Sequence, residues 1–336
     1  MEVASAVGVA LASARPPSTV GVASEPGVPV QADSRTATSA AVIGKRISIG
    51  LGNMSAYFLT TEVPCDPEIH RILHILEFPM DLGLNGARAL VGGASGGLGL
   101  ALAEALVAEG ARVALVARSR DRLEEHARRL GNGAVAVPAD LATADGPGAA
   151  VEAAVEHFGG LDLLVANSGG PPIGRFQDLS EAQWDQALDG VLWMLIRTLR
   201  AALPHLRASD RGAILVGLSS TVREPIPGLT TSNTIRPGIV GLIKSLVSEI
   251  APVRINGIAP GHIATERAGL VDRARAAEEG SSVEEVVARM TERIPLGRYG
   301  EPAEVGRLAA FLLSPAASYV NGAIVPVDGG MVVSLP

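Results

Sequence analysis

The chain has 336 residues, a formal net charge of -7, 47% apolar residues and a single cysteine. One cysteine excludes a disulfide framework and is typical of a protein of the reducing cytoplasm. The acidic balance argues against nucleic acid as a general partner, because nucleic-acid binding needs a basic surface. This composition predicts a globular protein with one main hydrophobic core.

Residues 1–79 differ in character from the rest of the chain. Met1–Ala41 is mostly Ala, Val, Ser, Pro, Gly and Thr without sustained periodicity, which is typical of disorder. It lacks a positively charged start and a long apolar stretch, so we expect neither a signal peptide nor a membrane anchor. Residues 80–336 should therefore form the domain, with Met80 as the true start and a disordered or misassigned leader before it. His70 and His74 could share a helix face, but no third ligand accompanies them, so no metal site is expected.

From Met80 onward, strand and helix signals alternate in a regular series. Apolar runs predict strands at Ala87–Val91, Val113–Val116, Ala134–Val137, Leu161–Val165, Ala213–Leu218, Val253–Ile258 and Ala323–Val327. Amphipathic stretches predict helices over Leu98–Leu106, Glu181–Leu206, Thr234–Ile250 and Glu301–Leu313. This alternation predicts an α/β fold, a single domain with a Rossmann-like doubly wound parallel sheet.

A glycine-rich loop follows the first of these strands. Residues 91–99 read Val-Gly-Gly-Ala-Ser-Gly-Gly-Leu-Gly, between a strand signal and a helix signal. That context favours a dinucleotide-binding loop over an ordinary glycine turn. Gly93 can take a tight turn, Gly97 lets backbone N–H groups approach a pyrophosphate, and Gly99 lets the helix pack close to the strand. The helix N-terminus then faces the phosphate charge.

The end of the second strand bears on the choice of cofactor. An NAD-selective site has an acidic side chain there, whereas this chain has Ala117 followed by Arg118. A guanidinium can hold a 2'-phosphate with two hydrogen bonds, so the sequence favours NADP(H), with NAD(H) as the alternative. Ser95 could be a further phosphate contact. Arg118 and Arg120 could instead only solvate the start of a helix.

From about Met80 to the C-terminus the chain resembles the short-chain dehydrogenase/reductase family, and most closely its 3-oxoacyl-(acyl carrier protein) reductases. The motifs that carry the resemblance are the loop at 91–99, Asp140-Leu141, Asn167-Ser168-Gly169, Leu218-Ser219-Ser220, Pro260-Gly261-His262-Ile263-Ala264-Thr265, Pro295–Pro302 and Val327–Gly330. The resemblance implies that NADP(H) is bound by Gly93, Ser95, Gly97, Leu98, Gly99, Arg118, Asp140, Leu141, Asn167, Gly169, Arg236, Pro260, Gly261, Ile263 and Thr265.

The catalytic positions that the resemblance implies are altered. The family uses a Ser, a Tyr, a Lys and an Asn, and here Ser220 fits only the first. Ser232 stands in the Tyr place, Arg236 in the Lys place and Val191 in the Asn place. A phenol with a pKa of about 10 can be tuned toward neutrality, whereas a serine hydroxyl is a poor general acid.

Two hypotheses of different class follow. In the first, the protein reduces a ketone or 3-oxoacyl thioester with NADP(H): Ser220, Ser232, Asn233 or a water positions the carbonyl, and Arg236 supplies electrostatic stabilisation. In the second, it is a catalytically impaired NADP-binding homologue that acts as a partner subunit or a redox-state sensor.

The remaining predictions concern the surroundings of the site. Residues 266–290 are predicted to form a mobile helical lid over the substrate, with Gly280 as a hinge. The resemblance implies a homodimer or homotetramer, which we expect to associate through the helices over Glu181–Leu206 and Thr234–Ile250.

Overall fold

The computed structural model describes residues 48–51, 54–57 and 81–334. The chain divides into two units, Met1–Phe78 and Pro79–Pro336. In the first unit, β1 (Ser48–Leu51) pairs with β2 (Met54–Tyr57) in antiparallel orientation. Apart from β1 and β2, the predicted leader, with His70 and His74, lies outside the described residues, so the leader hypothesis stays a prediction.

The second unit is built on a parallel sheet of seven strands, in the order β5-β4-β3-β6-β7-β8-β9. The strands are β3 (Arg88–Gly92), β4 (Arg112–Ala117), β5 (Ala134–Pro138), β6 (Leu163–Ala166), β7 (Ala213–Gly217), β8 (Arg254–Pro260) and β9 (Ile324–Val327). The strand order reverses between β3 and β6, which makes that point the topological switch of the sheet. The predicted doubly wound α/β fold is confirmed.

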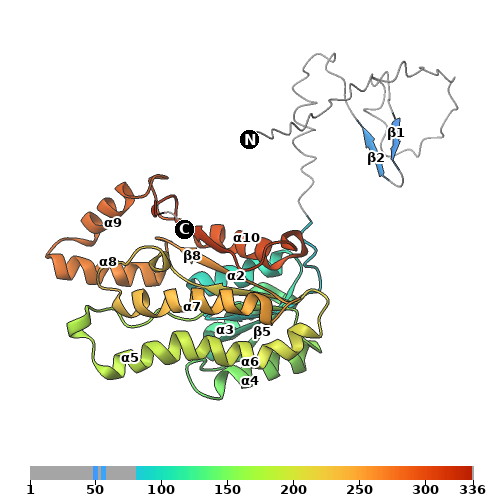
Figure 1. The fold of residues 1–336 in the computed structure, drawn as a ribbon, viewed down its shortest axis with the longest axis horizontal. Helices are drawn as coiled ribbons and strands as arrows, with labels where there is room; N and C mark the ends of the chain where they lie inside the picture. The colour runs from blue at the N-terminus through green and yellow to red at the C-terminus, as the bar shows by residue number, and fades with distance from the viewer. Residues whose placement is uncertain (1–47, 52–53, 58–80, 335–336) are drawn as a thin grey trace, which may run out of the picture. The chain divides into compact units, whose positions relative to one another are not determined.

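Helices cover both faces of this sheet, as Figure 1 shows. The strands are apolar on both sides: Leu90 of β3 packs into one core cluster, while its neighbour Val91 packs into the other. The first cluster lies under α4 (Gly146–Phe158), α6 (Met194–Arg207) and α7 (Thr230–Glu249). The second lies under α2 (Gly97–Ala108), α3 (Arg120–Leu130) and α10 (Pro302–Leu313).

Two of the predicted helices differ from those in the structure. The helix predicted over Glu181–Leu206 is interrupted: α5 (Glu181–Ala187) is followed by a π-helical turn (Leu188–Trp193) and then by α6. A π-helical turn holds one more residue than an α-helical turn, and this changes the spacing of apolar residues too little to be detected. The sequence therefore did not show this break. The other helix, α7, begins at Thr230, four residues before the predicted start, and therefore carries Ser232.

The predicted lid consists of two helices, α8 (Glu266–Glu279) and α9 (Val283–Glu292), which lie side by side in Figure 1. Gly280 ends α8 with a φ of 64°, a left-handed conformation that favours glycine. Ser282 and Glu285 then form a capping box that starts α9. Ala276, Val286 and Met290 form a small hydrophobic cluster separate from the two sheet cores. Among the described helices, none has the length and apolar character needed to cross a membrane.

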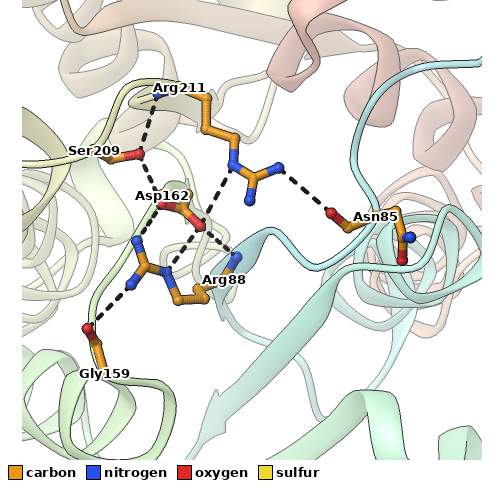
Figure 2. Close-up of polar contacts among 6 residues, drawn as sticks. All are labelled: Asn85, Arg88, Gly159, Asp162, Ser209 and Arg211. Carbon is orange, nitrogen blue, oxygen red and sulfur yellow. Dashed lines mark hydrogen bonds and ion pairs between the residues drawn. The ribbon is translucent and has the colours of Figure 1, made fainter.

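A polar cluster ties segments together at the amino ends of the strands (Figure 2). The buried carboxylate of Asp162 accepts hydrogen bonds from Arg88 Nε at 2.9 Å, Arg88 Nη2 at 2.6 Å and Ser209 Oγ at 2.7 Å. Arg211 Nε lies 3.7 Å from the same carboxylate. Burial by itself would raise the pKa of Asp162, but the bonds from Arg88 and Ser209 and the charge of Arg88 together lower it from 3.8 to about 2.

Candidate cofactor and active site

A cleft of about 880 Å³ opens at the carboxyl ends of the strands, beside the topological switch. The structure brings the residues predicted to bind NADP(H), together with Ser220 and Ser232, into the lining of this cleft. They are Gly93, Ser95, Gly97, Leu98, Gly99, Arg118, Asp140, Leu141, Asn167, Gly169, Ser220, Ser232, Arg236, Pro260, Gly261, Ile263 and Thr265. Across the described residues, no group of three or more His, Cys, Asp or Glu side chains could hold a metal ion.

The glycine loop leaves the start of α2 open to the cleft. Gly96 precedes the helix and offers no capping side chain, so the N–H groups of the first turn can bind an anion. Gly93 has a φ of 66°. A Cβ on Gly99 would lie 2.1 Å from the carbonyl oxygen of Gly93, a backbone contact that no side chain could relieve. This close approach explains why residue 99 is a glycine.

Asn167, at the end of β6, holds the glycine loop in place. Its Nδ2 donates a hydrogen bond to the carbonyl oxygen of Gly92 at 3.1 Å. A Cβ on Gly92 would lie 2.4 Å from the backbone oxygen of Asn167, so this backbone has room only for glycine at residue 92. The two central strands are thereby joined directly at the floor of the cleft.

The end of the cleft beside β4 is lined by two arginines, Arg118 and Arg122. Arg120 is not among the lining residues, and its guanidinium lies 3.6 Å from Glu124 on the exposed surface of α3. Of Arg118 and Arg120, only Arg118 therefore lies where it could contact a phosphate in the cleft. The sequence analysis did not name Arg122, which lies on the first turn of α3.

Buried hydroxyl groups gather at the end of the cleft beside β7. The side chains of Ser220 and Ser232 line the cleft and are only 4% and 6% exposed. Ser232 Oγ lies 3.1 Å from Thr221 Oγ1, and either group could be the donor. Thr221 was missed in the sequence analysis, and no local signal could have identified it, because its contact with Ser232 joins a loop to a helix.

Arg236 lies one turn after Ser232 on α7 and is 8% exposed. Its Nη1 donates to the carbonyl oxygen of Gly217 at 2.7 Å, while its buried Nε has no hydrogen-bond partner among the described residues. Burial and the nearby charge of Arg267 lower the pKa of Arg236 to about 10. The guanidinium is therefore still protonated at neutral pH.

Arg267, on the first turn of α8, is a second cation in the lining of the cleft. Its Nη2 donates to the carbonyl oxygen of Pro171 at 2.6 Å, and burial lowers its pKa. The sequence analysis missed this residue as well. Its position two residues after Thr265, at the start of the predicted lid, was the available signal.

Asn233 and Tyr299 do not line the cleft. The side chain of Asn233 accepts from the backbone N–H of Ile226 at 3.1 Å and donates to the carbonyl of Ile226 at 2.9 Å. The suggestion that Asn233 positions a carbonyl is therefore wrong. The hydroxyl of Tyr299 donates to Asp272 at 3.3 Å, and burial followed by the charge of Asp272 raises its pKa to about 12. Within residues 81–334, no tyrosine lines the cleft.

Comparisons with known proteins agree with this architecture. Residues 93–332 match a family model described as enoyl-(acyl carrier protein) reductase. A 3-oxoacyl-[acyl-carrier-protein] reductase of Staphylococcus aureus is 32% identical over 250 residues, which cover 72% of this chain and 97% of that protein. An uncharacterized oxidoreductase of Mycobacterium bovis is 35% identical over 251 residues, covering 74% of this chain and 97% of its own.

Solved structures show the same relationship. The L-sorbose reductase of Gluconobacter frateurii, complexed with NADPH and L-sorbose, superposes with a TM-score of 0.72 and 32% identity. The superposition covers 76% of this chain and 100% of the reductase. The sheet order, the cleft and these similarities agree, and the chain belongs to the short-chain dehydrogenase/reductase family.

Proposed function

We propose that the protein is an NADP(H)-dependent reductase that converts a carbonyl group, in a 3-oxoacyl compound or another ketone, to an alcohol. One observation carries this proposal: a single cleft combines an open helix N-terminus, two arginines at one end, and buried hydroxyls with a cation at the other. The first two features fit a phosphorylated dinucleotide, and the third fits a carbonyl oxygen that gains negative charge.

The residues present fit NADP(H). The close approach of Gly99 to Gly93 leaves room for a pyrophosphate at the start of α2, and Arg118 with Arg122 suits a 2'-phosphate. When bound, the cofactor would supply the hydride. The NADPH held by the related L-sorbose reductase supports this choice of cofactor.

In this proposal the chain's own groups polarise the substrate. Ser220 and Ser232 donate hydrogen bonds to the carbonyl oxygen, and Thr221 orients Ser232 when it donates to the serine oxygen. Arg236 stabilises the charge that develops on the substrate oxygen, because its charge acts at short range in a buried site. The proton that completes the alcohol passes from water through these hydroxyls.

The second candidate is a catalytically impaired homologue that binds NADP(H) and acts as a partner subunit or redox-state sensor. The absence of a tyrosine from the lining formed by residues 81–334 favours it. Both candidates predict binding of the cofactor, and only the reductase predicts turnover.

The test is to titrate the full chain with NADPH by fluorescence and then follow NADPH absorbance with ketones and 3-oxoacyl thioesters. We expect turnover, and Arg236→Ala should lower kcat by about a hundredfold to a thousandfold, the usual effect of losing one group that stabilises an oxyanion. Lys244→Ala is the matched control, since Lys244 lies on α7 but does not line the cleft. NADPH binding without turnover of any compound would instead favour the partner or sensor.

A further inference from the structure

Two positively charged side chains face the cleft without an acidic partner. Arg236 and Arg267 both line it, and no ion pair within the described part of the chain includes either of them. They are close enough to repel one another, since the charge of Arg267 disfavours the protonated form of Arg236. Arg236 is buried and Arg267 is half-buried, and two such like charges cost free energy unless an anion accompanies them.

Both guanidinium groups are held in fixed positions. Arg236 is anchored by the carbonyl of Gly217, and its unpartnered Nε is buried in the lining of the cleft. Arg267 is anchored by the carbonyl of Pro171 and lies against Gly170, where a Cβ would come within 2.4 Å of Arg267 Nε. Gly170 thus makes room for the guanidinium. A site built in this way recognises a planar anion such as a carboxylate.

Other groups in the cleft are available for the phosphate charges of the cofactor. Arg118 and Arg122 follow β4, and the open N-terminus of α2 follows β3. Arg236 is anchored at the end of β7, and Arg267 follows β8, on the other side of the topological switch. The pair therefore lies on the side of the sheet that is left for the substrate.

We infer that Arg267, beside the charge of Arg236, binds a carboxylate of the substrate, so that the compound reduced is an oxo acid rather than a neutral ketone or an ester. This inference rests on the proposed function, because it assigns a substrate class to the same site. The carboxylate contacts Arg267 and offsets one of the two positive charges. Arg236 then remains to stabilise the ketone oxygen, which faces Ser220 and Ser232.

The binding test uses a complex that cannot react. The full chain saturated with NADPH is titrated by calorimetry with 3-hydroxybutanoate and with its methyl ester, since an alcohol cannot be reduced further. We expect the acid to bind roughly tenfold to a hundredfold more tightly than the ester, which corresponds to the strength of charge-assisted hydrogen bonds. Arg267→Gln should remove this preference, and Arg267→Lys should keep part of it.

A kinetic test compares kcat/KM for acetoacetate, 3-oxohexanoate and 3-oxooctanoate with the values for their methyl esters. The acids should be preferred by a similar factor, and Arg267→Gln should abolish the preference. Arg273→Gln is the matched control, because Arg273 is an exposed arginine of the same helix that does not line the cleft. It should leave the ratio of acid to ester unchanged.

The outcomes separate the carboxylate site from the reductase proposal. A preference for the acid in the NADPH complex, lost in Arg267→Gln, supports the site even if no compound is turned over. Reduction of esters and acids with equal efficiency would overturn the site while leaving the reductase intact. Weaker NADPH binding by Arg267→Gln with an unchanged ratio of acid to ester would also overturn it, because the arginine would then serve a phosphate of the cofactor. Failure of every acid to bind would overturn it as well.

Discussion

A serine hydroxyl is much less acidic than a phenol, and this difference decides whether residue 232 can donate a proton to the substrate. The resemblance to the family puts Ser232 at the position of a tyrosine, and a serine hydroxyl is a poor general acid near neutral pH. The structure surrounds Ser232 with Thr221 and Ser220 and places the buried cation of Arg236 one turn away. In the reductase that we propose, these hydrogen-bond donors and this one charge would together stabilise the developing oxyanion.

Arg118 carries the prediction of cofactor choice. Arg118→Glu should weaken NADPH binding by roughly tenfold to a hundredfold and leave NADH binding unchanged or improved, because the carboxylate repels a 2'-phosphate and can accept from ribose hydroxyls. Fluorescence titration with both cofactors measures this. Arg120→Glu is the control, since Arg120 pairs with Glu124 outside the cleft. An equal effect of both substitutions would mean that only the general charge of this surface matters.

At the scale of elements, the segments that build the cleft depend on close backbone contacts and on one irregular helix. The glycine loop fits between β3, α2 and the end of β6 only because Gly92 and Gly99 lack side chains. The π-helical turn between α5 and α6 contributes Gly190 and Val191 to the lining. Such turns are frequent at functional sites because they redirect a short stretch of helix.

Gly99→Ala tests the close approach of α2 to the loop. The added Cβ would meet the carbonyl of Gly93, so α2 would have to move away from the loop. We expect a loss of stability of about 1–3 kcal/mol and an NADPH affinity at least about tenfold lower. Denaturant unfolding and fluorescence titration measure the two effects.

The control for this variant is Gly148→Ala in α4, where an added Cβ would have no neighbour within 4 Å. Alanine is the better helix former, so this substitution should stabilise the protein by about 0.5–1 kcal/mol and leave NADPH binding unchanged. If Gly99→Ala had the same effects as Gly148→Ala, the close contact with the carbonyl of Gly93 would not be the reason for a glycine at residue 99.

At the scale of the whole domain, the two ends of the strands have different roles. The cleft occupies the carboxyl ends, whereas the Asp162 cluster of Figure 2 joins β3, the start of β6 and the loop before β7 at the amino ends. The opposite position of the cluster indicates a role in stability. The predicted lid mobility and the homodimer or homotetramer through α5, α6 and α7 stay predictions.

Asp162→Asn should lower the free energy of unfolding by about 2 kcal/mol at neutral pH, because charge-assisted hydrogen bonds from Arg88 and Ser209 are lost. The folded pKa of about 2 lies below the value of 3.8 expected in the unfolded chain. The stabilisation is therefore present above about pH 4 and is lost as the pH falls toward 2. Urea unfolding between neutral and acid pH measures this.

The control is Asp185→Asn, on the exposed surface of α5. This substitution should change stability by less than about 0.5 kcal/mol at any pH. If the wild type and Asp162→Asn lost stability in parallel as the pH fell, Asp162 would not be the group responsible.

The sequence by itself determined the fold and which glycines and which arginine, Arg118, line one end of the cleft. Strands buried on both faces must be apolar, crossover helices must be amphipathic, and a backbone that approaches a phosphate needs glycine. Each of these requirements concerns a short stretch of residues, so it can be recognised in the sequence. The predicted strands, the loop at 91–99 and the placement of Arg118 depend only on them.

Only the tertiary structure decided what surrounds Ser232 and Arg236. Thr221, Asn233 and Arg267 make contacts between separate secondary-structure elements or loops, and residue spacing does not encode such contacts. The sequence analysis therefore missed Thr221 and Arg267 and gave Asn233 a role that its bonds to Ile226 exclude. The local charge at Arg236 and Arg267 depends on which charged side chains the fold brings close together. Tertiary packing decides this, and the order of residues along the chain does not show it.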